Sequence, residues 1–528
     1  MHQYSRRELL TRGAAVGAAA VAAPALLGGS LSAASAATKP ARRLPGRGKP
    51  VLESVEWLQQ WEEKMVGLGN RMGGTKGLVK WIDLIEDQLQ RLGLSTFRDT
   101  QQMPAATPSW NATSWKLAVV DGHKQTPITV ASYYPYSGAT PPSGITAEVV
   151  DIGAGTAADF TAQDLTGKIA LVEAPYPSQF QTYADWFNVS NTGGPGPQYL
   201  TYDPDNTIKP NDIYRSCFDY GTVTGGMPAL AAAAGAAGLV IVLDAAPNDA
   251  VGQYLPFARP FQNLPTLYLD RVAGKKFQNQ VTAGKNTARL TLAADIAATS
   301  VDNLTAILPG SNTNEYVIVL THIDGVGTAE ENGAFALVAM AKYLAQQPVS
   351  TRNRSVIFHF TYHMTPYVAT NGIDFQTFHP DLYDKSVTVF GVEHLGQMNW
   401  VDDNTTDRFY PTHRSEVAQL AVNTNAVLAG ICEQALKQHR LGRNLVCTNI
   451  RGVAGAHKAN MPSVGYCPLE NNLVSFAGQL NLRLGTFNAG LMRQQLQTWL
   501  TTYKLIDATS TATLFSSGGP YANPIPSP

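Results

Sequence analysis

Two hydrophobic periods alternate along the chain, and together they predict a mixed α/β protein. Between residues 51 and 94, apolar residues recur every three or four positions, which predicts two amphipathic helices around a Gly-rich turn at 67–74. From residue 145 to about 300 the pattern changes to short β-rich runs with turn residues between them and one Ala-rich helix. We expect this second stretch to form a separate β-rich module.

Beyond residue 301 buried strands and helices alternate. The expected strands cover 316–321, 355–363, 387–393 and 462–466, and the expected helices cover 332–347, 415–440 and 491–504. Apolar runs that alternate with helices predict an α/β fold, with a mainly parallel mixed sheet sandwiched by helices. Polar residues that end such strands meet at the carboxyl edge of the sheet, where chemistry gathers in this class of fold.

The amino terminus has the pattern of a bacterial export signal. Arg6 and Arg7 precede an apolar run at 13–27, and a small-residue cleavage motif follows at 34–36. These parts predict a twin-arginine signal peptide and a secreted or extracytoplasmic protein. The alternative is a membrane anchor, but the run is shorter than the ~20 residues that a span needs. No later run is long and apolar enough to span a bilayer, so we expect no stable membrane insertion.

Composition excludes some partners. The chain has 39 Lys+Arg and 40 Asp+Glu, so it lacks the overall positive charge that nucleic acid binding requires. Hydrophobic residues make up 44%, enough for large cores. Among Cys432, Cys447 and Cys467, one disulfide and buried free thiols are both open alternatives.

Imidazoles and carboxylates gather at the predicted strand ends. His322 and Asp324 close the first strand, Glu330 and Glu331 open the next helix, and the later strands end at His363, Glu393 and His394. Such N and O donors are those that zinc takes when one position stays open for water. His359 lies inside a strand between two Phe residues, which favours a core histidine instead.

These segments resemble the M28 family of zinc-dependent amino- and carboxypeptidases that carry an inserted protease-associated (PA) domain. The resemblance rests on 316–325, which ends in His-x-Asp, on Glu-Glu-Asn-Gly at 330–333, on PA-like runs at 164–172 and 234–238, and on the Gly-rich turn at 69–74. It implies an exopeptidase-like core around a β-rich PA domain. The boundaries that we expect are a signal peptide at 1–36, a basic Pro-rich tether at 37–50, the first part of the core at 51–144, the PA-like domain at 145–300, the peptidase-like domain at 301–510 and a tail at 511–528.

The resemblance also assigns roles. It makes His322 a zinc ligand and Asp324 the carboxylate that orients it. Glu331 stands for an Asp that bridges two zinc ions in the family, and Glu393 stands for a terminal Asp ligand. Glu330 is the proton acceptor that we expect in this chain, although the resemblance does not assign it. Zinc is the expected cofactor, as one or two ions, or as none if the site is degenerate.

Two departures separate the chain from the family pattern. The Glu-Glu pair that supplies a general base and a ligand is replaced by Met364-Thr365, and neither side chain accepts a proton near neutral pH. The carboxy-terminal His ligand before Met461-Pro462 is also missing. His363, His394 or His457 are the available replacements, and the alternative is the loss of one metal position.

Two functions follow. The first is an exported aminopeptidase-like metallopeptidase with a peptide or protein substrate, working through metal-activated water at a divergent, single- or two-zinc site. The second is a non-catalytic binding protein on the same fold. A metal-dependent amide transferase or cyclase is a further alternative.

Overall fold

The computed structural model describes residues 49–103, 108–177, 181–183, 185, 200–209, 211–257, 261–362, 373–422, 425–447, 461–468 and 474–516. The predicted signal peptide, Met364-Thr365, His363 and His457 therefore lie outside the described residues. No helix in the described part is long and apolar enough to cross a membrane.

A nine-stranded sheet carries the centre of the fold. Its order is β1-β11-β13-β12-β14-β19-β17-β18-β7. The bounds are β1 Ser95–Gln102, β7 Leu200–Tyr202, β11 Ser300–Leu308, β12 Asn312–His322, β13 Arg354–Thr361, β14 Ser386–Val392, β17 Ala418–Val422, β18 Asn444–Cys447 and β19 Ser463–Pro468. The four central strands β13, β12, β14 and β19 are parallel, and antiparallel pairs join β11 and β17 to them. This confirms the prediction of a mixed sheet, with parallel strands at its centre and antiparallel pairs toward both edges.

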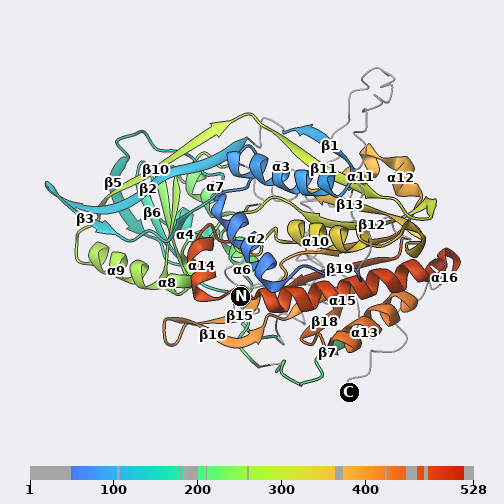
Figure 1. Ribbon diagram of the computed structural model, residues 1–528. Coiled ribbons are helices and arrows are strands. Elements are labelled where there is room, and N and C mark those ends of the chain that lie inside the picture. The colour runs from blue at the N-terminus through green and yellow to red at the C-terminus, as the bar shows by residue number, and fades with distance from the viewer. Residues whose placement is uncertain are drawn as a thin grey trace. The chain divides into compact units, whose positions relative to one another are not determined.

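Both faces of this sheet are buried, because alternate residues of the central strands enter different cores. In β12, Val317 and Val319 pack in the main hydrophobic core. Ile318 and Leu320 pack instead in a smaller cluster that contains Phe375. Figure 1 shows α10 along β12 and β13, and α13 beside α15. The helices of this part are α2 Val55–Gly67, α3 Lys76–Arg91, α10 Gly333–Ala345, α11 Ile373–Phe378, α12 Pro380–Asp384, α13 Ala426–His439, α14 Gly478–Leu484, α15 Ala489–Ala508 and α16 Thr511–Phe515, with a 3-10 turn at Val349–Thr351.

Polar caps fix where the covering helices begin. The side chain of Ser54 accepts from the backbone of Trp57 ahead of α2, and that of Thr75 accepts from Leu78 ahead of α3. Asn residues cap α13 and α15 in the same way. The two helices predicted between residues 51 and 94 are therefore confirmed, with the Gly-rich turn between them.

One predicted helix is wrong in its first half. Residues 415–440 were expected to be helical, but α13 begins only at Ala426, and 418–422 form strand β17. The apolar residues of this stretch pair with β18 on one side and β19 on the other, so sheet hydrogen bonds replace the helical ones. A hairpin, β15 Met398–Asp403 with β16 Arg408–Ser415, precedes it and was not predicted.

A second sheet has eight strands in the order β3-β2-β10-β5-β6-β8-β9-β4. Its strands are β2 Ser109–Asp121, β3 Lys124–Ile128, β4 Ser132–Tyr133, β5 Ile145–Asp151, β6 Ile169–Ala174, β8 Gly238–Leu243, β9 Thr266–Leu269 and β10 Thr287–Ala297. Its helices are α4 Ala157–Ala162, α6 Cys217–Thr224, α7 Met227–Ala233, α8 Pro247–Ala250 and α9 Arg271–Thr282. Three of these strands come from before residue 145, and β7 from within 145–300 pairs in the main sheet. The PA-like domain and its boundaries stay a prediction.

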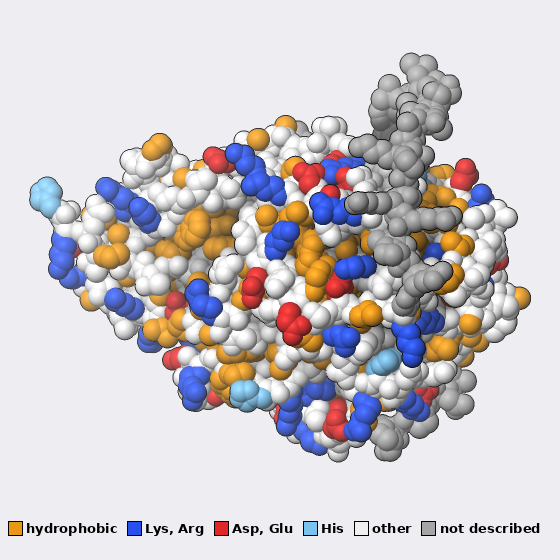
Figure 2. All heavy atoms as spheres, viewed as in Figure 1, with side chains coloured by type: hydrophobic (Ala, Val, Ile, Leu, Met, Phe, Trp, Pro, Cys, Tyr) orange, Lys and Arg blue, Asp and Glu red, His pale blue; other side chains and the backbone are white. Residues whose placement is uncertain are grey.

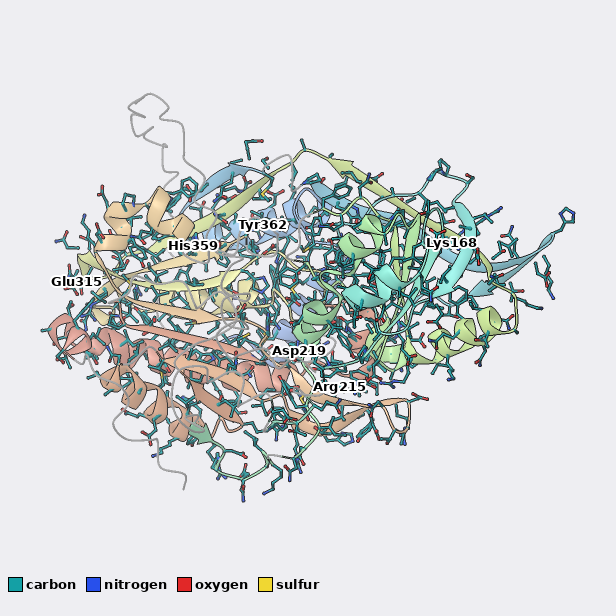
Figure 3. The ribbon with its side chains drawn as sticks, turned by 180° about the vertical axis from the view of Figure 1, so that it is seen from behind. Lys168, Arg215, Asp219, Glu315, His359 and Tyr362 are labelled. Carbon is teal, nitrogen blue, oxygen red and sulfur yellow. The ribbon has the colours of Figure 1, made fainter. Side chains whose placement is uncertain are left out.

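Buried ion pairs join the second sheet to the β15–β16 hairpin. The Oδ2 of Asp402 accepts from Arg215 at 3.2 Å and from Arg271 at 2.9 Å, and its Oδ1 accepts from the backbone N of Ala246 at 3.2 Å. Asp244 pairs with the same two arginines. Arg215 is labelled in Figure 3. One carboxylate in the hairpin therefore contacts Arg215, the first residue of α9 and the backbone just before α8.

Charge and thiols add little to this arrangement. Lys/Arg and Asp/Glu side chains are interspersed over the face in Figure 2, in line with the balanced composition. Cys432 is a free, buried thiol, in line with the free-thiol alternative for that residue, and Cys467 is also buried.

Candidate metal centre

His322 ends strand β12, and its main-chain neighbours fix its ring. The ring is 1% exposed, and Nδ1 donates to the backbone oxygen of Asp324 at 2.7 Å. The carboxylate of Asp324 lies farther from the same nitrogen, at 3.6 Å. Asp324 thus faces His322 as predicted, but its carbonyl makes the shorter contact. This leaves Nε2 directed at the next strand.

Glu393 and His394 follow β14, the parallel neighbour of β12, so their side chains meet His322 at one edge of the sheet. Adjacent residues of an extended strand point to opposite faces. His394 instead has a left-handed backbone, with φ of 56°, and this brings both side chains to the same point. The Nδ1 of His394 donates to the backbone oxygen of Pro468 at 2.8 Å, which fixes its ring from the end of β19.

Three side chains therefore converge. The Nε2 of His322 lies 3.4 Å from the Oε2 of Glu393 and 3.5 Å from the Nε2 of His394. The Nε2 of His394 lies 3.7 Å from the same oxygen of Glu393. Their ligand atoms all lie within 4.8 Å of one another. Among the described residues this is the group of His, Cys, Asp and Glu side chains with the spacing of a metal site.

Glu330 lies at the edge of this group. Its Oε1 is 3.8 Å from the Nε2 of His394, and its other oxygen is buried without a hydrogen-bond partner among the described residues. Burial, reinforced by the nearby charge of Glu393, raises the pKa of Glu330 to about 8. A buried carboxylate oxygen with nothing bound to it is the kind of donor that a cation satisfies.

The charge balance of the group also favours a cation. Burial opposes the charged form of His322, but the hydrogen bond to Asp324 and the charges of Glu393 and Glu330 outweigh it and raise the pKa of His322 to about 9. The carboxylates therefore attract positive charge to this point, whether it is a proton or a metal ion.

Glu331 is not part of the three-residue group. Its carboxylate contacts the Nε of Arg71, and both side chains are fully buried. Burial lowers the pKa of Arg71 to about 10, against the opposing charges of Glu62 and Glu330. Arg71 thus remains a cation at neutral pH, next to the site.

Glu62 is a site residue that the sequence analysis missed. It lies on the buried stripe of α2, and its carboxylate accepts from the backbone N of Ala329 at 2.9 Å and from the side chain of Asn332 at 3.2 Å. Asn332 in turn donates to the backbone oxygen of Leu395 at 2.6 Å and accepts from its N at 2.8 Å. A charged residue among the apolar positions of a predicted helix was the signal for this role.

The prediction for His359 is confirmed. It is 1% exposed within β13, where its Nδ1 lies 2.9 Å from the hydroxyl of Thr305 and its ring is 4.9 Å from that of Phe375. Figure 3 labels it together with Tyr362, which follows the end of the same strand. His359 is a core histidine.

A cavity of about 360 Å³ lies elsewhere, on the second sheet. It is lined by residues of β2, β3 and β10, among them Trp115, Lys116 and Arg289. No residue of the metal group lines it, so this cavity is separate from the metal group.

Comparison with solved structures places this geometry in a known fold. The zinc aminopeptidase BSAP from Bacillus subtilis matches with a TM-score of 0.58 and 15% identity, covering 89% of this chain and 99% of that one. The aminopeptidase from Aneurinibacillus sp. strain AM-1 matches with a TM-score of 0.53 and 15% identity over 90% and 97% of the two chains. A peptidase M28 precursor from Shewanella amazonensis matches with a TM-score of 0.56 and 15% identity over 87% and 98%.

Sequence comparison adds nothing to this result, because no family model and no curated protein matches the chain. The structural matches confirm, at the level of fold, the resemblance drawn from the strand-end residues. The chain has the fold of the M28 peptidases and zinc aminopeptidases.

Proposed function

We propose that the chain is a zinc-dependent peptidase that acts as an aminopeptidase on peptide substrates. The observation that carries the proposal is the convergence of His322, Glu393 and His394 at the carboxyl ends of two adjacent parallel strands. The fold shared with zinc aminopeptidases supports it.

The donor set fits zinc. Two imidazole nitrogens and one carboxylate oxygen form a combination found at catalytic zinc sites, which keep a fourth position for water or substrate. The unpartnered oxygen of Glu330 lies beside that set. His322 and His394 each donate their Nδ1 proton to a backbone carbonyl, so each ring offers its Nε2 to the ion.

The roles of the residues follow from these contacts. Zinc, when bound, polarises the scissile carbonyl and lowers the pKa of a water molecule. His322, Glu393 and His394 hold the ion, and Asp324 orients His322. Glu330 is the proton acceptor, because a nearby cation favours its charged form and lowers its raised pKa toward neutrality.

A second function remains in competition. Met364-Thr365 stands where the M28 pattern has its general base and a ligand, and this favours a non-catalytic binding protein on the same fold. The two functions differ in turnover, so a direct assay separates them.

The test combines metal content with hydrolysis. We expect elemental analysis of the purified full chain to find zinc, and a panel of aminoacyl arylamides to include a substrate whose hydrolysis stops with a chelator. Glu393→Gln should lose both the zinc and the activity. Glu416→Gln is the matched control, since Glu416 is also a buried carboxyl but pairs with Asn399 and Val417. If the purified chain contains zinc but hydrolyses no substrate, or contains no zinc, the chain is the non-catalytic binding protein.

Export and domain organisation belong to the same proposal. Residues 1–36 act as a twin-arginine signal, and the stretch 145–300 forms a PA-like module that contacts substrate or a partner. Replacing Arg6 and Arg7 by Lys should retain the protein in the cytoplasm, which cell fractionation and amino-terminal sequencing measure. Export of that variant at the normal level would contradict the signal.

A further inference from the structure

Arg71 is held beside the metal group by its backbone and by its side chain. Its N donates to the oxygen of Gly325 at 3.0 Å, and the N of Gly325 donates back at 3.3 Å, so a β-bridge ties it to the segment that follows His322. Its guanidinium donates to the backbone oxygens of Gly69 and Gly327, the latter at 2.8 Å. The side chain is therefore fixed in place before any ligand arrives.

The guanidinium is directed at Glu331. Its Nε contacts the Oε1 of Glu331, and neither side chain is exposed to solvent. Gly325 makes room for this pair, because a Cβ at that position would overlap the other oxygen, Oε2, of Glu331. The negative charge of Glu331 is thus neutralised by the buried guanidinium of Arg71.

We propose that Arg71 occupies the place of a second metal ion, so that the site binds a single zinc on His322, Glu393 and His394 while Glu331 is not a ligand. The inference rests on the proposed metal site and states how many ions that site takes. It replaces the expectation that Glu331 bridges two ions.

Charge and hydrogen bonding give the physical reason. Glu331 could coordinate an ion only by turning away from Arg71, which would leave a buried guanidinium with an unpaired charge. A second divalent cation beside Glu331 would also be repelled by Arg71 in a water-poor environment, where screening is weak. Moving Arg71 out would break its hydrogen bonds to two backbone carbonyls, of which that of Gly327 is buried.

The experiment counts ions. The full chain is stripped with a chelator, dialysed and titrated with zinc by isothermal calorimetry, with the stoichiometry checked by elemental analysis. We expect one equivalent. Two equivalents would overturn the single-ion inference but leave the proposed metal site standing, whereas no bound zinc would overturn the metal site itself.

Substitutions test which residues hold the ion and which residue limits the site to one ion. Glu331→Gln should bind one equivalent with a Kd within about threefold of the wild type, because Glu331 is not a ligand; loss of the ion in this variant would overturn the inference. Glu393→Gln should lower zinc affinity by more than tenfold, as expected for a ligand.

Arg71→Met frees the carboxylate of Glu331 and should allow a second equivalent to bind. Arg215→Met is the matched control: Arg215 is a buried arginine that pairs with Asp244 and Asp402, so its loss should leave one equivalent. If Arg71→Met folds, as judged by circular dichroism, and still binds one ion, the inference is wrong. If it does not fold, the Glu331→Gln titration decides alone.

Discussion

The side chain of Asn332 fixes the backbone that carries His394, and its removal should therefore weaken both the fold and the metal site. Asn332 is fully buried, and its amide makes two hydrogen bonds to the backbone of Leu395, the residue after His394. Asn332→Ala leaves a buried N–H and a buried carbonyl of Leu395 unpaired and also removes a hydrogen bond to Glu62. At about 1–3 kcal/mol for each orphaned backbone group, the free energy of unfolding should fall by about 4 kcal/mol from these two groups alone.

A matched variant separates the local effect from general destabilisation. Asn444 is also fully buried, and its side chain donates to the backbone oxygens of Leu441 and Gly442 at 2.6 and 3.0 Å, near the end of α13. Asn444→Ala should lower stability by a similar amount and leave zinc affinity unchanged. Asn332→Ala should in addition lower zinc affinity by about tenfold or more, as expected when a neighbour that orients a ligand is removed.

Urea unfolding followed by tryptophan fluorescence gives the stability, and calorimetric titration gives the zinc Kd. Two results would refute the reasoning. The first is a loss of less than about 1 kcal/mol in Asn332→Ala, which would mean that Leu395 finds other partners. The second is a zinc Kd equal to that of the wild type despite the lost stability, which would mean that the position of His394 does not depend on Asn332.

Three further predictions concern buried groups. Burial raises the pKa of Glu416 from 4.5 to about 7, so the folded chain keeps a proton that the unfolded chain loses. The free energy of unfolding should therefore fall by about 3 kcal/mol as the pH rises from about 4.5 to 7. Glu416→Gln should flatten this pH dependence in urea unfolding. Burial lowers the pKa of His359 from 6.5 to about 4, so the free energy of unfolding should fall by about 3 kcal/mol as the pH drops from about 6.5 to 4. His359→Leu should remove that loss. An unchanged loss of stability at low pH in this variant would contradict the role of His359. Gly325→Ala brings a methyl group against Glu331 and should destabilise the chain by about 2 kcal/mol, whereas Gly430→Ala, a control with open space in a helix, should be neutral or slightly stabilising in the same assay.

The parts of the fold that could be predicted are those whose local pattern and final partners agree. The strand predicted at 316–321 and the helix predicted at 332–347 correspond to β12 and α10, because long buried runs leave few other arrangements. Residues 418–422 were misassigned to a helix. Their strand depends on pairing with 444–447 and 463–468, and a local window contains no information on partners that distant in the chain.

The site was predictable to a similar extent. The rule that polar strand ends meet at one edge of the sheet predicted that His322 and Glu393 lie close together. His394 was among the expected replacement ligands. The left-handed turn that aligns His394 with Glu393 had no sequence signal, since a positive φ is uncommon at any residue other than glycine. The sequence indicated only that Arg71 lies in a Gly-rich turn, because its role depends on a β-bridge to Gly325.

Asp402 ties the part of the chain that carries the second sheet to the segment that follows the metal group. The hairpin that carries Asp402 begins within a few residues of His394, and its carboxylate grips Arg215, Arg271 and the backbone before α8. The short stretch 394–402 therefore carries both a member of the metal group and the carboxylate that ties the hairpin to the second sheet.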